Sequence, residues 1–468
     1  MSLPATAASP TATGIAARDI ETVLHPTTHL ADHRRNGPFV VARAEGTRVW
    51  DEQGREYIEG LAGLWCTALG YGVEELAEVA AEQMRDLSYT HLFAGKSHEP
   101  AVALAEKLRE MAPIPYAKTF FGVSGSDANE TQIKLAWYYN NALGRTEKKK
   151  IISRRRAYHG STLGAGSLTG LPTFHKSFDL PLPGILHVTC PHHYREAEPG
   201  ETEDEFAERL ARELDDLIRA EGPETVAAFI AEPVLGAGGV VVPPRGYYER
   251  IQAVLDEHEV ALIDDEVICG FGRLGTRFGA EAVGMKPATV SLAKALSSAY
   301  LPISAVLAPD SMVDVLVEAG ERWGVFGHGY TYAGHPVCAA VALRALELME
   351  ERDVYGNAAR VGNYFQERLA RFDDHRLVGE TRGMGMIGAC ELVADKASRA
   401  AFAPERGVGA HMERRCLEHG VILRALGDTV AFCPPLVVTE SDVDEILERF
   451  GRALDDTLAW IEAGGGAS

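Results

Sequence analysis

Residues 118–144 read KTFFGVSGSDANETQIKLAWYYNNALG, and this stretch decides the fold class of the chain. The run 118–122 is apolar and has the length of a strand. Apolar residues three or four apart mark 126–143 as an amphipathic helix that ends at Gly144. A strand that passes through a glycine-containing turn into a helix is the repeating unit of an α/β fold. We therefore expect the same unit on both sides of this stretch.

The alternation of strand and helix extends from about residue 98 to residue 345. Helices are expected at 98–111, 126–143, 203–221, 246–257 and 335–351. Strands are expected at 118–122, 150–153, 185–189, 226–231, 260–264, 289–293 and 303–308. Apolar runs without strict alternation, separated by helices, indicate a mostly parallel sheet that is covered on both faces. The sequence therefore predicts a large three-layer α/β domain.

The pattern changes after residue 351. It becomes a helix, a glycine-rich strand pair at 376–393, a helix, two short strands within 421–433 and a final helix. We expect residues 70–345 to form the large domain, and residues 19–69 and 346–468 to form a smaller α/β domain packed closely against it. Residues 1–18 are rich in Ala, Thr, Ser and Pro without an apolar run, which predicts a disordered tail rather than a signal peptide.

Composition excludes several classes of function. The 468 residues are 46% hydrophobic and 24% charged, which is typical of a globular protein of more than one domain. A net charge of −21 repels nucleic acid and anionic lipid, so neither is an expected partner. The most apolar stretch, 226–242, is too short to span a membrane and contains Glu232 and Pro233. Seven scattered cysteines without C-x-x-C spacing favour reduced thiols and a cytoplasmic location.

One glycine motif resembles a dinucleotide-binding loop but lacks its context. Residues 270–275 match G-x-G-x-x-G after a strand. The residues that follow do not start a helix, and the acidic residue expected about 20 positions later is absent. A nicotinamide-dependent oxidoreductase therefore remains only as an alternative.

The turn at 123–129 is a better candidate for a phosphate site. It follows a strand and opens a long helix, and Gly125 lets the backbone approach an anion. The first N–H groups of the helix and its dipole favour negative charge at this end. An ordinary helix cap is the alternative interpretation, because Ser124 and Asp127 suit that role by themselves.

Lys294 is the most unusual residue of the chain. It is the only charged side chain between Val290 and Pro309, at the end of an expected buried strand. Loss of solvation favours the neutral amine, which is the form that attacks a carbonyl and makes a Schiff base. A lysine whose ammonium reaches solvent while its stem is buried is the alternative.

Asp264, Asp265 and Glu266 end another expected strand, where α/β sheets bind ligands. Such carboxylates suit either a magnesium ion or a cation within the ligand. No nucleotide motif accompanies them, so we expect no metal and favour one carboxylate that faces a protonated ring nitrogen. Tyr158, also just after a strand, could stack on a ring or simply pack in the core. A phosphate cradle, an aromatic face, an acid and a Schiff-base lysine together indicate pyridoxal 5′-phosphate as the cofactor.

These residues also resemble a known family, the class III or omega aminotransferases of the fold-type I pyridoxal-phosphate enzymes. The similarity runs from about His25 onward and includes LAGLWC at 61–66, SGS at 124–126, YHG at 158–160, DEVICGFGR at 265–273 and GYTYAGHP at 329–336. It implies that Lys294 forms the Schiff base and that Asp265 pairs with the ring nitrogen. The remaining implied cofactor contacts are Gly125, Ser126, Tyr158, His159, Glu232, Val267 and, from the neighbouring subunit of a homodimer, Thr331.

Within that family the chain is most similar to the amine–pyruvate group. Trp65 and Arg424 occupy positions of its pattern, which implies an aromatic wall for the amine and a mobile guanidinium for the carboxylate of pyruvate. An ion pair with Asp428 is the alternative role for Arg424. Tyr89, Tyr158 and Ala237 complete the implied substrate contacts.

Several residues depart from the family pattern. Asp127 stands where glutamate is usual, Asp264 replaces a small apolar residue, and Leu235 replaces a polar one. The region YTHLFAG at 89–95 is partly similar to members that act on taurine or other ω-amino acids. The expected reaction is therefore transamination between an amine and a keto acid. A taurine- or β-alanine-type ω-amino acid–pyruvate aminotransferase, an aminomutase and a decarboxylase of the same fold remain as alternatives.

Overall fold

A central sheet organises the larger part of the molecule. The computed structural model describes residues 14–112, 115–116 and 118–466. Within these residues, seven strands pair in the order β4-β10-β9-β8-β7-β5-β6. Their bounds are β4 Lys118–Gly122, β5 Lys150–Arg154, β6 Ile185–Val188, β7 Val226–Ala231, β8 Ala261–Asp265, β9 Thr289–Leu292 and β10 Ser304–Ala308. All seven strands expected from the sequence are present, each within one residue of its expected ends.

The sheet is mostly parallel, as expected. The neighbours from β9 to β6 pair in parallel, whereas β10 is antiparallel to both β9 and β4. Because β10 is antiparallel to both of its neighbours, β4 points the same way as β9. The carboxyl ends of β4, β9, β8, β7 and β5 therefore lie along one edge of the sheet, where α/β proteins bind ligands.

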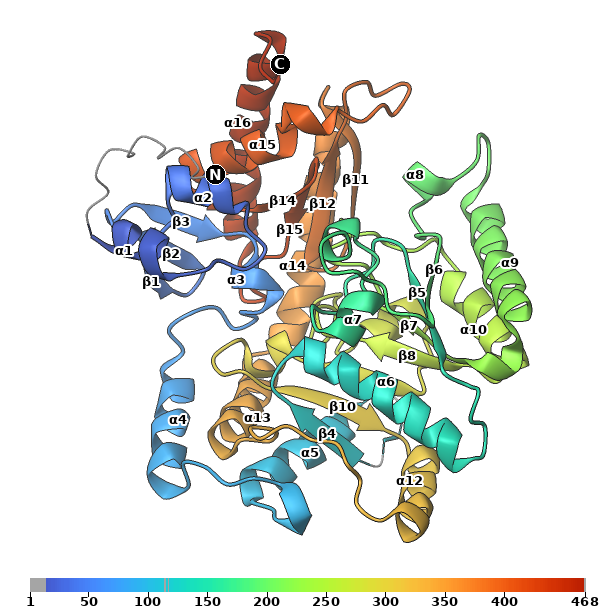
Figure 1. The fold of residues 1–468 in the computed structure, drawn as a ribbon. Coiled ribbons are helices and arrows are strands. Elements are labelled where there is room, and N and C mark those ends of the chain that lie inside the picture. The colour runs from blue at the N-terminus through green and yellow to red at the C-terminus, as the bar shows by residue number, and fades with distance from the viewer. Residues whose placement is uncertain (1–13, 113–114, 117, 467–468) are drawn as a thin grey trace, which may run out of the picture.

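Helices cover both faces of this sheet (Figure 1). Ile133 of α6 (Gly125–Ala142) packs against Ile230 and Ile263 on one face, which α7 (Leu163–Leu168) also covers. The alternate residues Phe229 and Leu262 pack on the other face, against α9 (Glu203–Glu221) and α10 (Tyr247–Glu257). Next to these helices, α5 (Glu99–Met111) and α13 (Pro336–Glu351) share one apolar cluster with β9 and β10. The predicted three-layer α/β fold is confirmed.

Helix starts follow from local capping chemistry. The side chain of Ser124 accepts a hydrogen bond from the Asp127 N–H, and the Asp127 carboxylate accepts one from the Ser124 N–H. This capping box begins α6 one residue before the predicted start, at the glycine of the turn. The same arrangement starts α9 at Thr202 and α16 (Glu440–Glu462) at Thr439.

The chain outside the central sheet builds two four-stranded sheets within the described residues. One has the order β1-β2-β3-β13, the other β11-β12-β15-β14. Their bounds are β1 Val41–Glu45, β2 Arg48–Asp51, β3 Glu56–Glu59, β11 Val378–Met384, β12 Ile387–Leu392, β13 Val421–Ile422, β14 Arg424–Leu426 and β15 Thr429–Phe432. The expected strand pair at 376–393 is β11 and β12. Figure 1 shows β1–β3 beside the C-terminal elements, and β13 joins them by pairing with β3.

The expectation of two strands within 421–433 was wrong, because three strands lie there. β13 pairs in parallel with β3, whereas β14 pairs with β15 across a turn at Gly427. Gly427 has φ 65°, a conformation that glycine adopts without strain. The chain therefore changes sheets at Leu423. No local pattern announces this change, since the partner strand β3 is more than 350 residues away.

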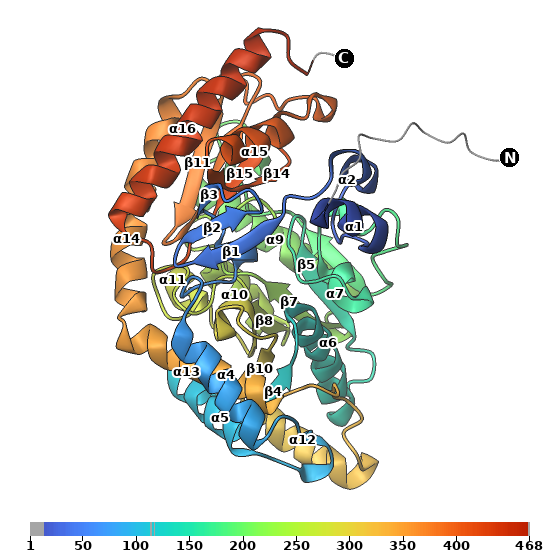
Figure 2. The ribbon, with the colours of Figure 1, turned by 90° about the vertical axis from the view of Figure 1, so that its left-hand side faces the viewer.

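The remaining helices surround these sheets. They are α1 Ile15–Thr22, α2 Leu30–Asn36, α3 Ala62–Trp65, α4 Glu74–Asp86, α8 His193–Glu196, α11 Gly279–Val283, α12 Asp310–Trp323, α14 Val354–Leu369 and α15 Val408–Glu418. In Figure 2, α14 and α16 line one side of the molecule, while α1 and α2 lie on the other. A single apolar cluster contains Leu292 of β9 together with Val430 of β15 and Phe450 of α16, so the central sheet and the C-terminal elements share a core.

The predicted tail at 1–18 falls mostly outside the described residues, which begin at residue 14. From Ile15 the chain is helical, so the last residues assigned to that tail belong to α1. Their Ala, Arg and Ile residues are compatible with a helix, and Asp19 contacts two histidines that follow it. In the residues that the structure describes, no helix has both the length and the apolar character needed to cross a membrane.

Candidate active site

Residues from the ends of five strands meet at the carboxyl edge of the central sheet. Asp265 ends β8, Glu232 directly follows β7, and Lys294 lies two residues after β9. Tyr158 lies four residues after β5, and Ser126 stands in the first turn of the helix that follows β4. The topology thus brings together residues that are up to 168 positions apart in the chain.

Two cavities share this edge. The smaller, of about 130 Å³, is lined by Gly125, Ser126, Asn129, Tyr158, His159, Gly160, Glu232, Asp265, Val267, Ile268 and Lys294. The larger, of about 650 Å³, is lined by Pro26, Thr27, Leu61, Leu64, Trp65, Tyr158, Leu171, Phe174, Ala237, Ile268, Lys294, Glu413 and residues 422–426. Lys294, Tyr158 and Ile268 line both, so the lysine stands between an inner polar cavity and an outer, largely apolar one.

Asp265 is held by three hydrogen-bond donors. Its Oδ2 accepts hydrogen bonds from Asn129 Nδ2 and His159 Nδ1, each at 2.7 Å, and its Oδ1 accepts one from the Val267 N–H at 3.1 Å. The side chain is only 3% exposed. Three donors fix the orientation of the carboxyl group. The structure therefore provides a fixed, buried carboxyl group in the wall of the inner cavity.

Glu232 holds backbone rather than a side-chain cation. Its Oε1 accepts the Tyr158 N–H at 3.0 Å and its Oε2 accepts the Gly236 N–H at 2.9 Å. Burial raises the pKa of the Glu232 carboxyl, an effect that the neighbouring His159 partly offsets. Behind it, the fully buried Arg154 donates to the Glu232 carbonyl at 2.7 Å. Glu232 thus positions the turn that carries Tyr158.

Lys294 has an unusual backbone conformation. It begins a short 3₁₀ turn, Lys294–Ser297, with φ 50°, in the left-handed region that is costly for a residue with a side chain. Strain of this kind persists only where surrounding structure imposes it, and it clusters at functional sites. Because Lys294 is preceded by the buried strand β9, its position in the cavity wall is set by the rigid part of the fold.

Gly125, in the predicted phosphate cradle, packs closely against Val267. A Cβ built on Gly125 would lie 2.9 Å from a methyl carbon of Val267, so only glycine fits between the helix start and this residue. Ser126 Oγ accepts the Ser161 N–H at 3.1 Å, which joins the helix start to the loop after Tyr158. The cap at Ser124 uses the N–H of Asp127, which leaves the N–H groups of Gly125 and Ser126 without a backbone acceptor within the helix.

The larger cavity contains the predicted substrate residues Trp65, Tyr158, Ala237 and Arg424. Arg424 makes no ion pair within 4.0 Å among the described residues. Its suggested partner, Asp428, instead accepts the Gly409 N–H at 2.9 Å. Tyr158 and Arg424 line the same cavity, where burial raises the pKa of the Tyr158 hydroxyl and the positive charge of Arg424 partly opposes this rise.

Two predicted residues lie elsewhere in this chain. Thr331 and Tyr89 are not among the residues that line either cavity. They contact each other, since Tyr89 Oη donates to the Thr331 carbonyl oxygen at 2.7 Å, and both are exposed.

Asp264 and Glu266 point away from Asp265. Successive residues of a strand face opposite sides of a sheet, and both of these carboxyls are fully buried. Glu266 accepts the N–H groups of Gly279 and Ala280 at 2.9 and 2.7 Å. The three acids do not gather around one point, so they do not form the magnesium cluster that the sequence left open.

The buried pair Asp264 and Glu266 predicts a pH-dependent stability. Burial and their mutual repulsion raise the pKa of Asp264, and burial raises that of Glu266. Raised carboxyl pKa values favour folding below the unfolded-state pKa and lose that contribution as pH rises through the folded-state pKa, by about 1.4 kcal/mol per pH unit for each proton.

Asp264→Asn should therefore lose less stability than the parent between pH 5 and pH 7.5 in urea unfolding. Asp216→Asn, at an exposed position, is the control and should behave like the parent. Identical pH slopes in all three proteins would show that the pair does not titrate in this range.

Sequence reasoning missed three positioning residues. Asn129 joins Asp265 to the His159 carbonyl oxygen, donating to both at 2.7 Å. Thr169 accepts the His159 N–H at 2.9 Å, and Phe174 packs edge-to-face on Tyr158. Asn129 carried a usable signal, because asparagine is unfavourable inside a helix unless its amide has a partner. Thr169 and Phe174 carried none.

The glycine motif at 270–275 is not a nucleotide loop. It forms turns that follow β8, and the next helix, α11, has only five residues. The N-terminus of α11 binds the Glu266 carboxylate, which leaves no free helix start for a pyrophosphate. The oxidoreductase alternative is therefore wrong.

The residues of the inner cavity fit pyridoxal phosphate. The cofactor needs an acid for its ring nitrogen, an anion site for its phosphate and an amine for its carbonyl. Asp265, the start of α6 and Lys294 supply these groups around one cavity. Two buried polar atoms there, Asn129 Oδ1 and His159 Nε2, have no hydrogen-bond partner within the described chain, as expected of a site shaped for a polar ligand.

Comparisons with known proteins identify similar chains. Residues 30–454 match the family model described as aminotransferase class-III. Gamma aminobutyrate transaminase 1, mitochondrial, from Solanum lycopersicum is 50% identical over 91% of this chain and 83% of its own length. The diaminobutyrate–2-oxoglutarate transaminase of Halomonas elongata is 47% identical over 94% and 95%. The solved omega transaminase from Pseudomonas jessenii in complex with PMP is 51% identical, with a TM-score of 0.95 over 97% of this chain and all of the other.

Proposed function

The chain belongs to the class-III aminotransferases, enzymes of fold type I that depend on pyridoxal phosphate, and from this premise we propose that it transfers the amino group of a primary amine or ω-amino acid to pyruvate. The observation that carries the proposal is the composition of the outer cavity. Its wall is largely apolar, and besides Lys294 it contains a single cationic side chain, Arg424.

Each half of the reaction uses the same residues of this chain. When bound, pyridoxal phosphate supplies an electron sink for the carbanion formed at the amine-bearing carbon. Lys294 lines both cavities, so its amine could take the proton from the amine-bearing carbon of the substrate and deliver it to the cofactor carbon that is bonded to the same nitrogen. Asp265 would face the ring nitrogen of the cofactor and favour its protonated form, and Tyr158, which follows β5, lines both cavities.

Arg424 supports a monocarboxylate acceptor. A guanidinium binds one carboxylate with two parallel hydrogen bonds, and Arg424 makes no ion pair within 4.0 Å in the described residues. The second carboxylate of 2-oxoglutarate would face the apolar wall formed by Leu64, Leu171 and Phe174 or the acidic Glu413, and would be left unpaired. Pyruvate leaves no such group.

The donor class is tested by a matrix of amines and keto acids. We expect arylalkyl amines and ω-amino acids to react with pyruvate, and 2-oxoglutarate to be at least about tenfold poorer as acceptor in kcat/KM, the factor that corresponds to roughly 1.4 kcal/mol. The relatives named gamma aminobutyrate transaminases make γ-aminobutyrate the ω-amino acid to test first. A preference for 2-oxoglutarate would contradict the proposed acceptor but not the transaminase activity.

Arg424→Ala should weaken the use of carboxylate substrates selectively. Losing a charge-assisted bidentate contact costs about 2–3 kcal/mol, or roughly thirty- to a hundredfold, so the apparent constants for pyruvate and alanine should rise by that factor. A carboxylate-free amine should react almost unchanged in its own half-reaction. Single-turnover measurement of each half-reaction gives the comparison, with the exposed Arg414→Ala as control. Equal losses for both donors would assign Arg424 a structural role.

A homodimer with shared sites is the second part of the proposal. Thr331 and Tyr89 are exposed together and away from the cavities of their own chain, which supports a contribution to the site of a second copy. Sedimentation at assay concentration should give a dimer, and Thr331→Ala should weaken cofactor binding measured by titration. A monomer that is fully active at that concentration would contradict this part.

A cytoplasmic location is also proposed. Seven cysteines are unpaired in the structure, and six of them are buried. Reduced thiols are typical of a cytoplasmic protein.

A further inference from the structure

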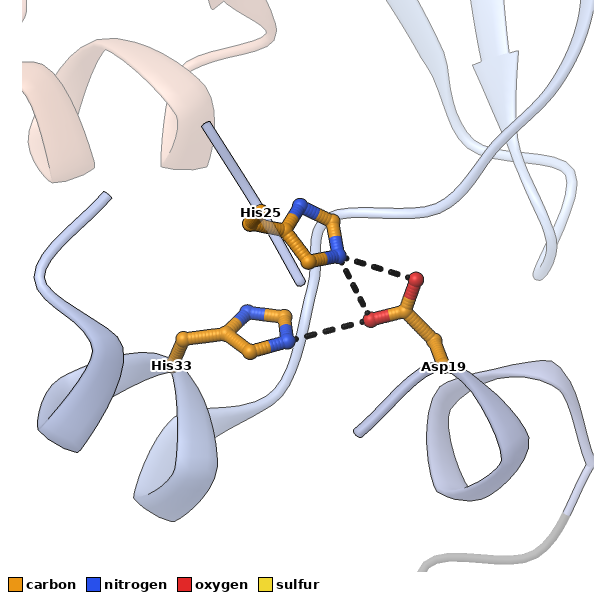
Figure 3. Close-up of side chains that lie close together, drawn as sticks. All are labelled: Asp19, His25 and His33. Atoms are coloured by element: carbon orange, nitrogen blue, oxygen red, sulfur yellow. Dashed lines mark hydrogen bonds and ion pairs between the residues drawn. The ribbon is translucent and has the colours of Figure 1, made fainter. Parts of the chain in front are cut away.

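Three potential metal ligands meet near the amino terminus, outside the site described above. Asp19 lies in α1, His33 lies in α2, and His25 lies in the segment between these helices. His25 Nε2 is 2.9 Å from Asp19 Oδ1, and His33 Nε2 is 3.1 Å from the same oxygen. Figure 3 shows both imidazole rings turned toward this one carboxylate. Two imidazole nitrogens and a carboxylate oxygen thus converge from three separate parts of a short segment.

We propose that Asp19, His25 and His33 bind a divalent transition-metal ion of the zinc class, and that the ion fixes the chain segment that lines the outer cavity at Pro26 and Thr27. Two histidines and one carboxylate are a recognised ligand set for such ions. Ligand atoms at 2.0–2.2 Å from a tetrahedral zinc lie roughly 3.3 Å apart. The two separations from Asp19 Oδ1, 2.9 and 3.1 Å, need to open by only a few tenths of an ångström, and all three ligand atoms lie within 4.8 Å of one another.

Two other clusters within the described residues also combine histidine with carboxylates, but arginines already pair with their carboxylates. His192 lies with Glu380 and Glu391, and these carboxylates already bind the guanidiniums of Arg382 and Arg195. The cluster at 215, 257 and 258 is bound in the same way by the arginine at 219. An arginine at the carboxylates opposes a second cation.

Asp19 differs from those acids. Within the described residues its ion-pair partners are His25 and His33 alone. His33 Nε2 is buried and makes no hydrogen bond within the described residues, so this ring nitrogen is available to a metal ion. The Asp19 and His33 side chains are 17% and 10% exposed, so a bound ion would be partly shielded from water.

The segment has little else to hold it. Neither α1 nor α2 contains a fully buried residue. The polar contacts of Asp19 are therefore a main tie between the two helices, and a metal bond in their place would restrict the segment strongly. Pro26 and Thr27 follow His25 directly and line the outer cavity. Fixing His25 consequently fixes part of the wall that a substrate would meet.

Zinc binding by the tag-free holoenzyme is the first test. After treatment with chelator and dialysis against Zn²⁺, we expect one zinc per chain by elemental analysis, and slower amide exchange over residues 15–36 in hydrogen-exchange mass spectrometry. His33→Ala and Asp19→Asn should each lower the zinc affinity at least tenfold and remove the protection. The unfolding temperature without zinc shows whether each variant is folded.

His29→Ala is the matched control. His29 belongs to the same segment but is 71% exposed and contacts Asp32 instead. This variant should keep the zinc and the protection. Absence of zinc in the parent at tens of micromolar, or equal zinc in the parent and in both ligand variants, would overturn the proposed site. When Co²⁺ replaces Zn²⁺, an absorbance band typical of thiolate ligation would overturn the site as well, because it would assign the metal to a cysteine.

The coupling to the outer cavity rests on the proposed function and has its own readout. Zinc should lower KM for a bulky amine donor by at least about threefold in the parent and in His29→Ala, with kcat changed less than twofold, and should have no effect in His33→Ala. Zinc binding without any change in KM would overturn the coupling. Loss of transamination with every donor would contradict the proposed function and leave the zinc count unaffected.

Discussion

Replacing Lys294 by alanine should lower the transamination rate by at least about a thousandfold while the protein still folds and binds pyridoxal phosphate. The nucleophile and the proton carrier are lost together, and groups that act as a unit produce losses of this size. Binding should survive, because Asp265 and the start of α6 are held by hydrogen bonds that do not involve Lys294.

Borohydride reduction followed by peptide mapping tests the assignment in the parent protein. The pyridoxyl label should appear on the peptide that contains Lys294. Lys176→Ala is a matched control, because Lys176 is exposed two residues after the cavity residue Phe174 and should be dispensable. A label on another lysine, or a Lys294→Ala protein that retains more than about one percent of the rate, would contradict the assignment.

The central sheet was predictable because its signals are local. Each strand of this sheet is a short apolar run, and each flanking helix has its own period and cap, so neither requires knowledge of a distant partner. The short strands at 421–432 show the opposite case. β13 exists because β3 lies beside it, and pairing between distant segments leaves no mark in the local pattern.

The same division applies to the candidate site. Lys294 was found because a lone charge in an apolar run is locally unusual, and Asp265 because it ends a strand. Its neighbour Asp264 was grouped with it, although the two-residue period of a strand puts their side chains on opposite faces. Asn129 and Thr169 acquire their roles only when α6 and the loop after β5 meet, which the sequence does not show.

Asp265→Asn should lower kcat by about a hundredfold or more and weaken cofactor affinity by less than about tenfold. Breaking a buried, hydrogen-bonded charge interaction costs about 3–5 kcal/mol, which is roughly two to three and a half powers of ten. The asparagine cannot hold a proton on the ring nitrogen by charge. The amide has only one accepting oxygen, so it cannot accept all the hydrogen bonds that the two carboxylate oxygens accept from Asn129, His159 and Val267. It also presents no negative charge to the cavity.

The expected split between rate and affinity separates an electronic role from a structural one. The expected phosphate contacts, Gly125 and Ser126, lie at the start of α6 after β4, whereas Asp265 ends β8. The phosphate contacts should therefore be unchanged when Asp265 is replaced. A merely structural Asp265 would lose cofactor affinity and thermal stability together with activity. Titration of the cofactor, the unfolding temperature and single-turnover rates therefore have to be measured on one preparation.

Because Asp265→Glu retains the negative charge but not the distances to Asn129 and His159, it should recover part of kcat. If the asparagine variant transaminates at nearly the parental rate, the ring nitrogen does not depend on this carboxylate, and the fixed anion at the end of β8 serves only to orient His159 and Asn129.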